Sequence, residues 1–204
     1  MKLENFDANR HDVNQVSELI YETDSEIFDA LFGTKDAALD VFKSMIMHEA
    51  DTYFNPPHLK MMMDEGTFIG IVASYEGHLQ KTLGRETRQR MFKRLGLTSA
   101  LKKFNITRKV ARISRITMED DALYILYLAV LPTYRHQGYG SRAVDLLQEN
   151  YHTVYLHLNY KNNDARRFYE SIGFEKSEEY YNCHKQTPIG YIILKRTSTD
   201  AIKQ

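Results

Sequence analysis

The sequence predicts a single α/β domain in which a mixed β-sheet is flanked by helices. The chain has 204 residues, of which 43% are hydrophobic and 26% charged, as in soluble globular proteins that bury a core without a metal or disulfide. Its second half alternates strand and helix, which is typical of crossover connections between parallel strands. We find no repeat, linker or low-complexity tract, so residues 1–204 are expected to form one domain.

The first 46 residues predict one strand and three helices. Residues 2–6 give a weak strand signal. Apolar residues at helical spacing predict helices over 11–21, 24–32 and 34–46. The residues expected to cap or stop these helices are Asp12, Gly33 and Thr34.

A β-hairpin is expected after the helices. The pair Pro56-Pro57 ends the helical section, because proline restricts the backbone of the residue before it. Residues 58–63 and 67–75 then become β-like, and Glu65-Gly66 supplies a turn between them.

A strongly basic segment follows the hairpin. Residues 81–115 hold 12 bases and one acid, a net charge of +11, whereas residues 1–80 hold 15 acids and 5 bases, net −10. We expect a basic amphipathic helix over 85–95, inside an insertion at about 78–115. Such a segment could meet RNA or another polyanion, or it could be a solvated helical face that lies against the acidic first 80 residues. We favour the second interpretation.

The second half of the chain carries the strongest strand signal. Residues 123–130 are almost uniformly apolar, so this strand is expected at the centre of the sheet. The elements expected after it are a helix at 141–150, a strand at 153–158, a helix at 164–172, and strands near 179–181 and 191–194.

Several classes of protein are excluded by composition. The longest apolar run, 122–131, is far shorter than the ~20 residues of a spanning helix, so we expect no membrane partner. The first ten residues contain Glu4 and Asp7 and no apolar core of a secretory signal, which favours a cytoplasmic location. The lone Cys183 fits a reducing compartment. No metal site is expected, because His152, His157 and Cys183-His184 lack the spacing of a ligand set.

A glycine-containing loop connects the central strand to the next helix. It reads Pro132-Thr-Tyr-Arg-His-Gln-Gly-Tyr-Gly-Ser141, and its two glycines allow consecutive N–H groups to converge on an anion at a helix N-terminus. The segment Gly138-Tyr-Gly140-Ser-Arg-Ala143 satisfies the dinucleotide fingerprint, but seven residues separate Val130 from Gly138, and 153–161 contains no acid. No Gly-Lys-Ser/Thr of a nucleotide P-loop occurs.

Two elements in this region resemble the GNAT superfamily of N-acetyltransferases. The first is Arg135-His-Gln-Gly138-Tyr-Gly140, similar to the family's Arg/Gln-x-x-Gly-x-Gly/Ala between an apolar strand and a helix. The second is Asn162-Asn-Asp-Ala165-Arg-Arg-Phe-Tyr169-Glu-Ser-Ile-Gly173-Phe174, similar to Asn-x-x-Ala-x-x-x-Tyr-x-x-x-Gly-Phe. Together they cover about 120–180, whereas residues 1–119 match only in element order. The basic insertion departs from the minimal family pattern.

The resemblance implies the GNAT fold, with two splayed parallel strands, and direct transfer of an acetyl group from acetyl-CoA to an amine. No metal is needed. The main chain of Leu128, Ala129 and Val130 would bind the pantetheine arm, and one of its N–H groups would polarise the thioester carbonyl. The remaining residues expected to contact the cosubstrate are Arg135, His136, Gln137, Gly138, Tyr139, Gly140, Ser141, Asn162 and Ala165.

Three residues are expected to be catalytic. Many family members use a Glu on the apolar strand, but Tyr124 stands there. Tyr124 and His157 instead match the tyrosine and histidine with which the protein amino-terminal acetyltransferases deprotonate their substrate through water. Tyr169 corresponds to the family's tyrosine near the departing sulfur. A hydrogen-bonded structural histidine and a core aromatic are the alternatives for His157 and Tyr169. Reserve bases are Glu22, Glu119, Asp120 and Asp121.

The partner of the enzyme would be a primary amine: a small amine, a polyamine or a peptide amino terminus. The alternative function is a CoA-binding module without transferase activity that holds RNA or another polyanion through residues 81–115. We do not expect nucleic acid as the main partner, and a homodimer is left open.

Overall fold

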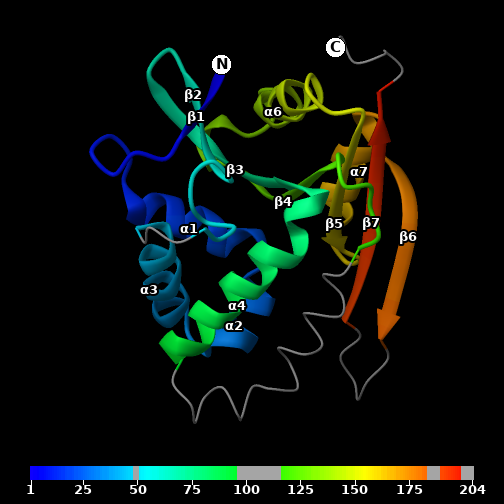
Figure 1. The fold of residues 1–204 in the computed structure, drawn as a ribbon. Helices are drawn as coiled ribbons and strands as arrows, with labels where there is room; N and C mark the ends of the chain where they lie inside the picture. The colour runs from blue at the N-terminus through cyan, green and yellow to red at the C-terminus, as the bar shows by residue number, and fades with distance from the viewer. Residues whose placement is uncertain (48–50, 96–115, 183–188, 199–204) are drawn as a thin grey trace.

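The computed structural model describes residues 1–47, 51–95, 116–182 and 189–198 (Figure 1). A seven-stranded mixed sheet with the order β1-β2-β3-β4-β5-β7-β6 forms the middle of the molecule. Helices α1, α2 and α3 lie on one side of it, and α6 and α7 lie near β4 and β5 (Figure 1). None of the helices in the described ranges is long and apolar enough to cross a membrane.

The elements of the first 46 residues agree with the sequence. β1 spans Lys2–Asn5, α1 Val13–Thr23, α2 Ser25–Phe32 and α3 Lys35–Ile46. The expected caps are confirmed, because the Asp12 carboxylate accepts from Asn14 N (2.8 Å) and Thr34 Oγ1 accepts from Ala37 N (3.2 Å). Gly33 ends α2 with a φ of 95°, a conformation that glycine adopts without strain. Apolar residues of these helices pack together on strands β2 and β3.

The hairpin and the basic helix follow. β2 (Leu59–Asp64) and β3 (Thr67–Glu76) pair antiparallel, and the turn between them has positive φ at Glu65 and Gly66. A short 3₁₀ turn, η1 (Gly77–Leu79), leads into α4 (Gln80–Leu95). This helix begins five residues earlier than expected. Its first turn is held by the fully buried Leu83, but the sequence there has few other apolar residues to indicate a helix. Residues 96–115 of the predicted insertion lie outside the described residues.

The second half confirms the alternation of strand and helix. β4 (Leu123–Val130) is the fourth of the seven strands, as its apolar sequence predicted. The elements after it are η2 (Pro132–Tyr134), α6 (Tyr139–Gln148), β5 (Thr153–Asn159), α7 (Asn163–Ser171), β6 (Glu175–Asn182) and β7 (Ile189–Thr197). β6 is longer than predicted because it is a polar edge strand, whose sequence gives no apolar run to mark its start.

The two parallel strands β4 and β5 separate halfway along their length. Leu123 pairs with Val154, Tyr124 with Tyr155 and Ile125 with Leu156, and the pairing ends there. β4 nevertheless continues to Val130 while remaining paired with β3, and β5 continues to Asn159 while remaining paired with β7. The splayed parallel strands expected from the resemblance are therefore present.

Candidate functional site

The glycine loop brings free main-chain donors to the start of α6. Gly138 has a φ of 79°, and His136 adopts a φ of 62° just before it. The first bond of α6 is Arg142 N to Gly138 O (3.1 Å). Within the described ranges, the N–H groups of residues 136–141 donate to no protein acceptor. Unpaired donors at a helix N-terminus, on the positive end of its dipole, fit a diphosphate.

The second glycine of the loop allows α6 to approach α7. A Cβ added to Gly140 would lie 3.0 Å from Cζ of Phe168, tighter than ordinary carbon contacts. The side chains of the loop mostly bind back to their own segment: Gln137 Nε2 donates to Thr133 O (2.9 Å), and Ser141 Oγ donates to Gly138 O (2.9 Å). The loop therefore presents backbone, rather than charged side chains, to an anion.

The edge of β4 that faces the split carries main-chain groups without strand partners. Leu131 N donates to Ile69 O of β3 (2.9 Å), so strand alternation turns Ala129 toward β3 and turns Leu128 and Val130 toward the split. Arg135 Nε donates to the Val130 carbonyl (2.9 Å). Of the three residues predicted to bind the pantetheine arm, the structure thus presents Leu128, and the N–H of Val130, at the open edge.

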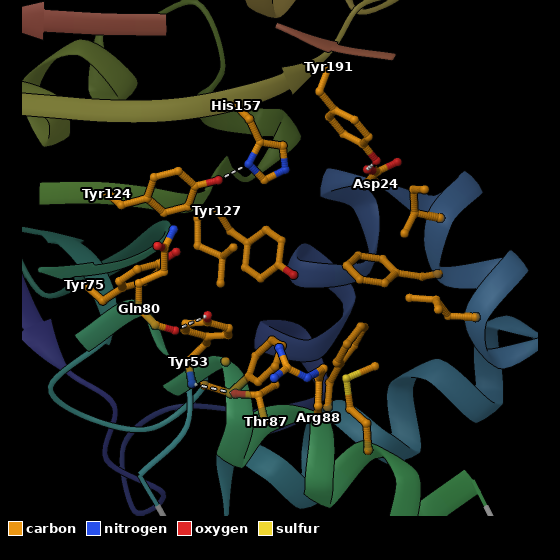
Figure 2. A pocket seen from close by; sticks show the side chains of 18 of the residues that line it. Asp24, Tyr53, Tyr75, Gln80, Thr87, Arg88, Tyr124, Tyr127, His157 and Tyr191 are labelled. Carbon is orange, nitrogen blue, oxygen red and sulfur yellow. Dashed lines mark hydrogen bonds between the residues drawn. The ribbon is translucent and has the colours of Figure 1, made fainter. Parts of the chain in front are cut away.

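A pocket of about 300 Å³ opens where β4 and β5 separate (Figure 2). Helices α2, α3 and α4 and strands β3, β4, β5 and β7 contribute to its wall. Its aromatic lining consists of Phe28, Phe42, Tyr53, Phe54, Tyr75, Tyr124, Tyr127 and Tyr191. Asp24 is the one acidic residue among the described residues that line it. Faces of aromatic rings attract ammonium groups, so the pocket is suited to a cationic amine.

Tyr124 of β4 and His157 of β5, two of the three residues expected to be catalytic, meet in this pocket. The Tyr124 hydroxyl and His157 Nδ1 form a hydrogen bond, and the second ring nitrogen of His157 lies on the side away from Tyr124 (Figure 2). Burial lowers the pKa of His157 to about 4, because the charged imidazolium loses its hydration. The imidazole is therefore neutral at pH 7, and the tautomer with hydrogen on Nδ1 exposes a lone pair on Nε2.

Asp24 and Tyr191 are site residues that the sequence reasoning missed. The Tyr191 hydroxyl donates to Asp24 Oδ2 (3.2 Å), and the Tyr191 ring packs edge-on against His157 with centroids 5.0 Å apart. Burial raises the pKa of Asp24 from 3.8 to about 6, although the hydrogen bonds from Tyr191 and the main chain of Ile27 oppose that rise. In the sequence Asp24 looks like an ordinary residue at a helix start, and no local pattern links it to a tyrosine 167 positions away.

The other predicted residues lie away from the pocket. Tyr169 is buried on α7 between Phe168 and Phe174, and burial raises its pKa. Asn162 caps α7, because its Oδ1 accepts from Ala165 N (3.0 Å). Tyr139 directs its hydroxyl to Asp64 Oδ2 (2.9 Å). Asn162 Oδ1 and the Ala165 N–H therefore bind each other, and the Tyr139 hydroxyl binds Asp64, so these three predicted cosubstrate contacts are engaged within the protein.

The reserve bases do not line the pocket. Glu22 is half-exposed and pairs with Arg135 (Oε2 to NH2, 3.1 Å). Glu119, Asp120 and Asp121 lie in an exposed turn before β4. The Glu119 carboxylate is 3.7 Å from Lys195 Nζ, and a main-chain hydrogen bond lowers its pKa most. Of the acids considered from the sequence, none faces His157.

Helix α4 forms one wall of the pocket through Gly84, Thr87, Arg88 and Met91. It also contacts α3, where Arg94 Nε donates to Ser44 Oγ (2.9 Å). In the described part of the chain, no base of α4 pairs with an acid of the first 80 residues. The described part of the basic segment, α4, thus packs against α3 without ion pairs to it.

Within the described ranges, no group of three His, Cys, Asp or Glu side chains is arranged to hold an ion. Cys183-His184 lies outside them.

Comparisons with known proteins agree with this arrangement. Residues 105–176 match the family model of the acetyltransferase (GNAT) domain. Over 90 residues the chain is 34% identical to "Probable N-acetyltransferase san" of Drosophila melanogaster, in a match that covers 40% of this chain and 48% of that protein. The chain therefore matches about half the length of this curated relative.

Two solved structures share the fold. An N-acetyltransferase from Staphylococcus aureus Mu50 aligns with a TM-score of 0.68 at 18% identity, covering 96% of this chain and all of that one. Ard1 from Thermoplasma volcanium aligns with a TM-score of 0.53 at 15% identity, covering 98% of both chains. The family match falls on the split strands, the glycine loop and α7, so this part of the chain is similar to the GNAT acetyltransferase domain, and the described structure shares the fold of the acetyltransferase from Staphylococcus aureus Mu50.

Proposed function

We propose that this protein is an N-acetyltransferase that moves the acetyl group of acetyl-CoA directly to a primary amine. The observation that carries the proposal is the split between β4 and β5, which has a phosphate-binding loop on one side and an aromatic, acid-containing pocket on the other. When bound, acetyl-CoA supplies an activated thioester carbonyl and a thiolate leaving group. The chain's residues hold this group, receive the amine and accept its proton.

The glycine loop and the free edge of β4 hold the two ends of the cosubstrate. The N–H groups of 136–141 bind the diphosphate, and Leu128 and the Val130 N–H pair with the pantetheine arm as a further strand would. An N–H of this edge polarises the thioester carbonyl, a role worth roughly 3 to 4 kcal/mol where similar donors have been removed. The Arg135 side chain keeps the Val130 carbonyl occupied.

His157 and Tyr124 accept the proton that the amine must lose. An alkyl ammonium has a pKa near 10.4, so it arrives protonated at neutral pH. In the tautomer with hydrogen on Nδ1, His157 donates to the Tyr124 oxygen and keeps Nε2 free to take that proton, directly or through water. Because its pKa is about 4, His157 then passes the proton on to solvent at neutral pH. The new N–C bond forms as the C–S bond breaks. The Tyr169 hydroxyl, on α7, donates a hydrogen bond or a proton to the departing thiolate, the role that the family resemblance implies.

Thiol release over a panel of amines tests the proposal, together with thermal stabilisation by acetyl-CoA. We expect millimolar acetyl-CoA to raise the melting temperature, because a ligand that binds only the folded state stabilises it. His157→Ala should lower kcat roughly a hundredfold, at the lower end of general-base contributions, while keeping the thermal shift. His152→Ala is the matched control, since His152 is exposed at the start of the same strand. Absence of any thermal shift in the wild type would overturn the proposal.

Tyr124→Phe and Tyr169→Phe separate the remaining roles. Tyr124→Phe removes the hydrogen bond to Nδ1, so it should reduce the rate and change its pH profile. Tyr169→Phe should reduce the rate most for those amines whose reaction is limited by loss of the thiolate, because the hydroxyl that stabilises the thiolate is removed. An unchanged rate in the Tyr169 variant assigns that residue to the core alone.

A further inference from the structure

The charged groups of the pocket are arranged asymmetrically around its aromatic lining. Asp24 lies beside Tyr191 and His157 at one side of the pocket, and Arg88 lies at the other (Figure 2). Lys81, which is also on α4, lines the pocket too. Lys81 and Arg88 are exposed, and neither makes an ion pair within the described ranges. The pocket therefore has one negative group near the catalytic pair and two positive groups on the helical wall.

Asp24 has the surroundings of an ammonium-binding group. No described Lys, Arg or His lies within ion-pair distance of it, so its carboxylate has no internal cation. Its hydrogen-bond partner Tyr191 touches the His157 ring, which places the carboxylate one side chain away from the base. The Tyr127 ring lines the same part of the pocket (Figure 2). A carboxylate next to aromatic faces is the arrangement that binds ammonium groups strongly.

We infer that Asp24 binds the reactive ammonium of the acceptor, and that Lys81 and Arg88 select against a second positive charge at its far end. The acceptor is then a small primary monoamine with an apolar body and a neutral or anionic tail, rather than a polyamine. This inference rests on the proposed transferase function.

Two further observations support this acceptor class. The volume of about 300 Å³ suits a small molecule, and most of the lining is aromatic or aliphatic. A second ammonium would meet no second carboxylate in the described lining and would approach two cations, which is unfavourable in a partly desolvated site. Burial raises the pKa of Asp24 to about 6, so the carboxylate is ionised at the pH of the assay and gains from a cationic partner.

Three amines of equal length test the tail preference of the wild type. Pentylamine, 5-aminopentanoate and 1,5-diaminopentane present a neutral, an anionic and a cationic tail. We expect kcat/KM for the first two to exceed that for the diamine by about tenfold at about pH 7.5. Arg88→Gln should reduce this difference in kcat/KM between the amines. Arg85→Gln is the control and should leave the difference unchanged, because Arg85 pairs with Glu86 and does not line the pocket. A preference for the diamine would overturn the tail assignment.

Asp24→Asn tests the ammonium contact itself. We expect its KM for benzylamine to rise at least about tenfold, with little change for phenylhydrazine, which is uncharged at about pH 7.5. Asp29→Asn is the matched control, because Asp29 is on the same helix, is exposed and accepts from Tyr21 (2.7 Å). Equal KM changes for the charged and uncharged nucleophiles would refute the inference.

The readouts separate this inference from the function on which it rests. A wild type that binds no acetyl-CoA and acetylates no amine contradicts the proposed function. A wild type that acetylates amines, with an Asp24→Asn variant of unchanged KM and normal acetyl-CoA thermal shift, contradicts only the role of Asp24.

Discussion

Replacing Asp24 should make the protein more stable while weakening its binding of the acceptor. The raised pKa of about 6, against 3.8 ordinarily, means that ionised Asp24 opposes folding at neutral pH. This difference corresponds to about 3 kcal/mol, and partial solvent exposure lowers the expected gain to about 1 to 3 kcal/mol for Asp24→Asn. Asparagine has nearly the same shape and can accept the hydrogen bond from Tyr191.

The pH dependence of this gain follows from the two pKa values. The unfolded chain ionises Asp24 above about 3.8, and the folded chain only above about 6, so the penalty grows between these values and is complete above about 6. We expect urea unfolding to show the variant more stable than the wild type at about pH 7.5, with the gap falling below about 1 kcal/mol near pH 4.

Two results would contradict this reasoning about Asp24. One is a variant that is no more stable than the wild type at about pH 7.5, and the other is a gain that does not change with pH. Asp29→Asn in α2 should give no comparable gain, because Asp29 is exposed and its charge keeps its hydration in the folded chain.

Three further outcomes can be measured with the same protein. The KM for an alkylamine should rise as the pH falls below about 6, because Asp24 loses its charge there, and a KM that stays flat to about pH 5 would argue against the ion pair. The titratable groups that influence Asp24 are Tyr191, Glu26 and Tyr127. Gly140→Val should lower stability by roughly 1 to 3 kcal/mol, because its side chain would press on Phe168, and equal melting temperatures would show that α7 yields without cost. Tyr191→Phe should raise the KM for benzylamine less than Asp24→Asn does, because it removes only the hydroxyl that orients the carboxylate; a larger effect would make Tyr191 the principal amine contact.

Local patterns predicted most of the fold. Caps at Asp12 and Thr34, the stop at Gly33 and the turn at Glu65-Gly66 depend on neighbouring residues alone, so they could be predicted from the sequence. The split between β4 and β5 could be expected only through the family resemblance, because nothing in two apolar strands says where their pairing stops.

The site was only partly predictable for the same reason. Tyr124 and His157 were found through their place in two matched strands, and they do meet. Asp24, Tyr127 and Tyr191 come from three distant segments, and their proximity results from the order β4-β5-β7 and from the way α2 packs near it. The start of α4 was predicted too late, since its first turn is held by one buried leucine, Leu83.

Most of the pocket wall lies outside the part of the chain that matches the family model. Only Tyr124, Leu126, Tyr127 and His157 of its lining fall inside residues 105–176, the part that matches the family model. The remaining lining residues belong to segments that precede or follow that match. If the proposed function is correct, substitutions in α2 or α4 would change the amine that is accepted and leave the residues proposed to bind acetyl-CoA unchanged, so proteins that share the glycine loop can differ in acceptor.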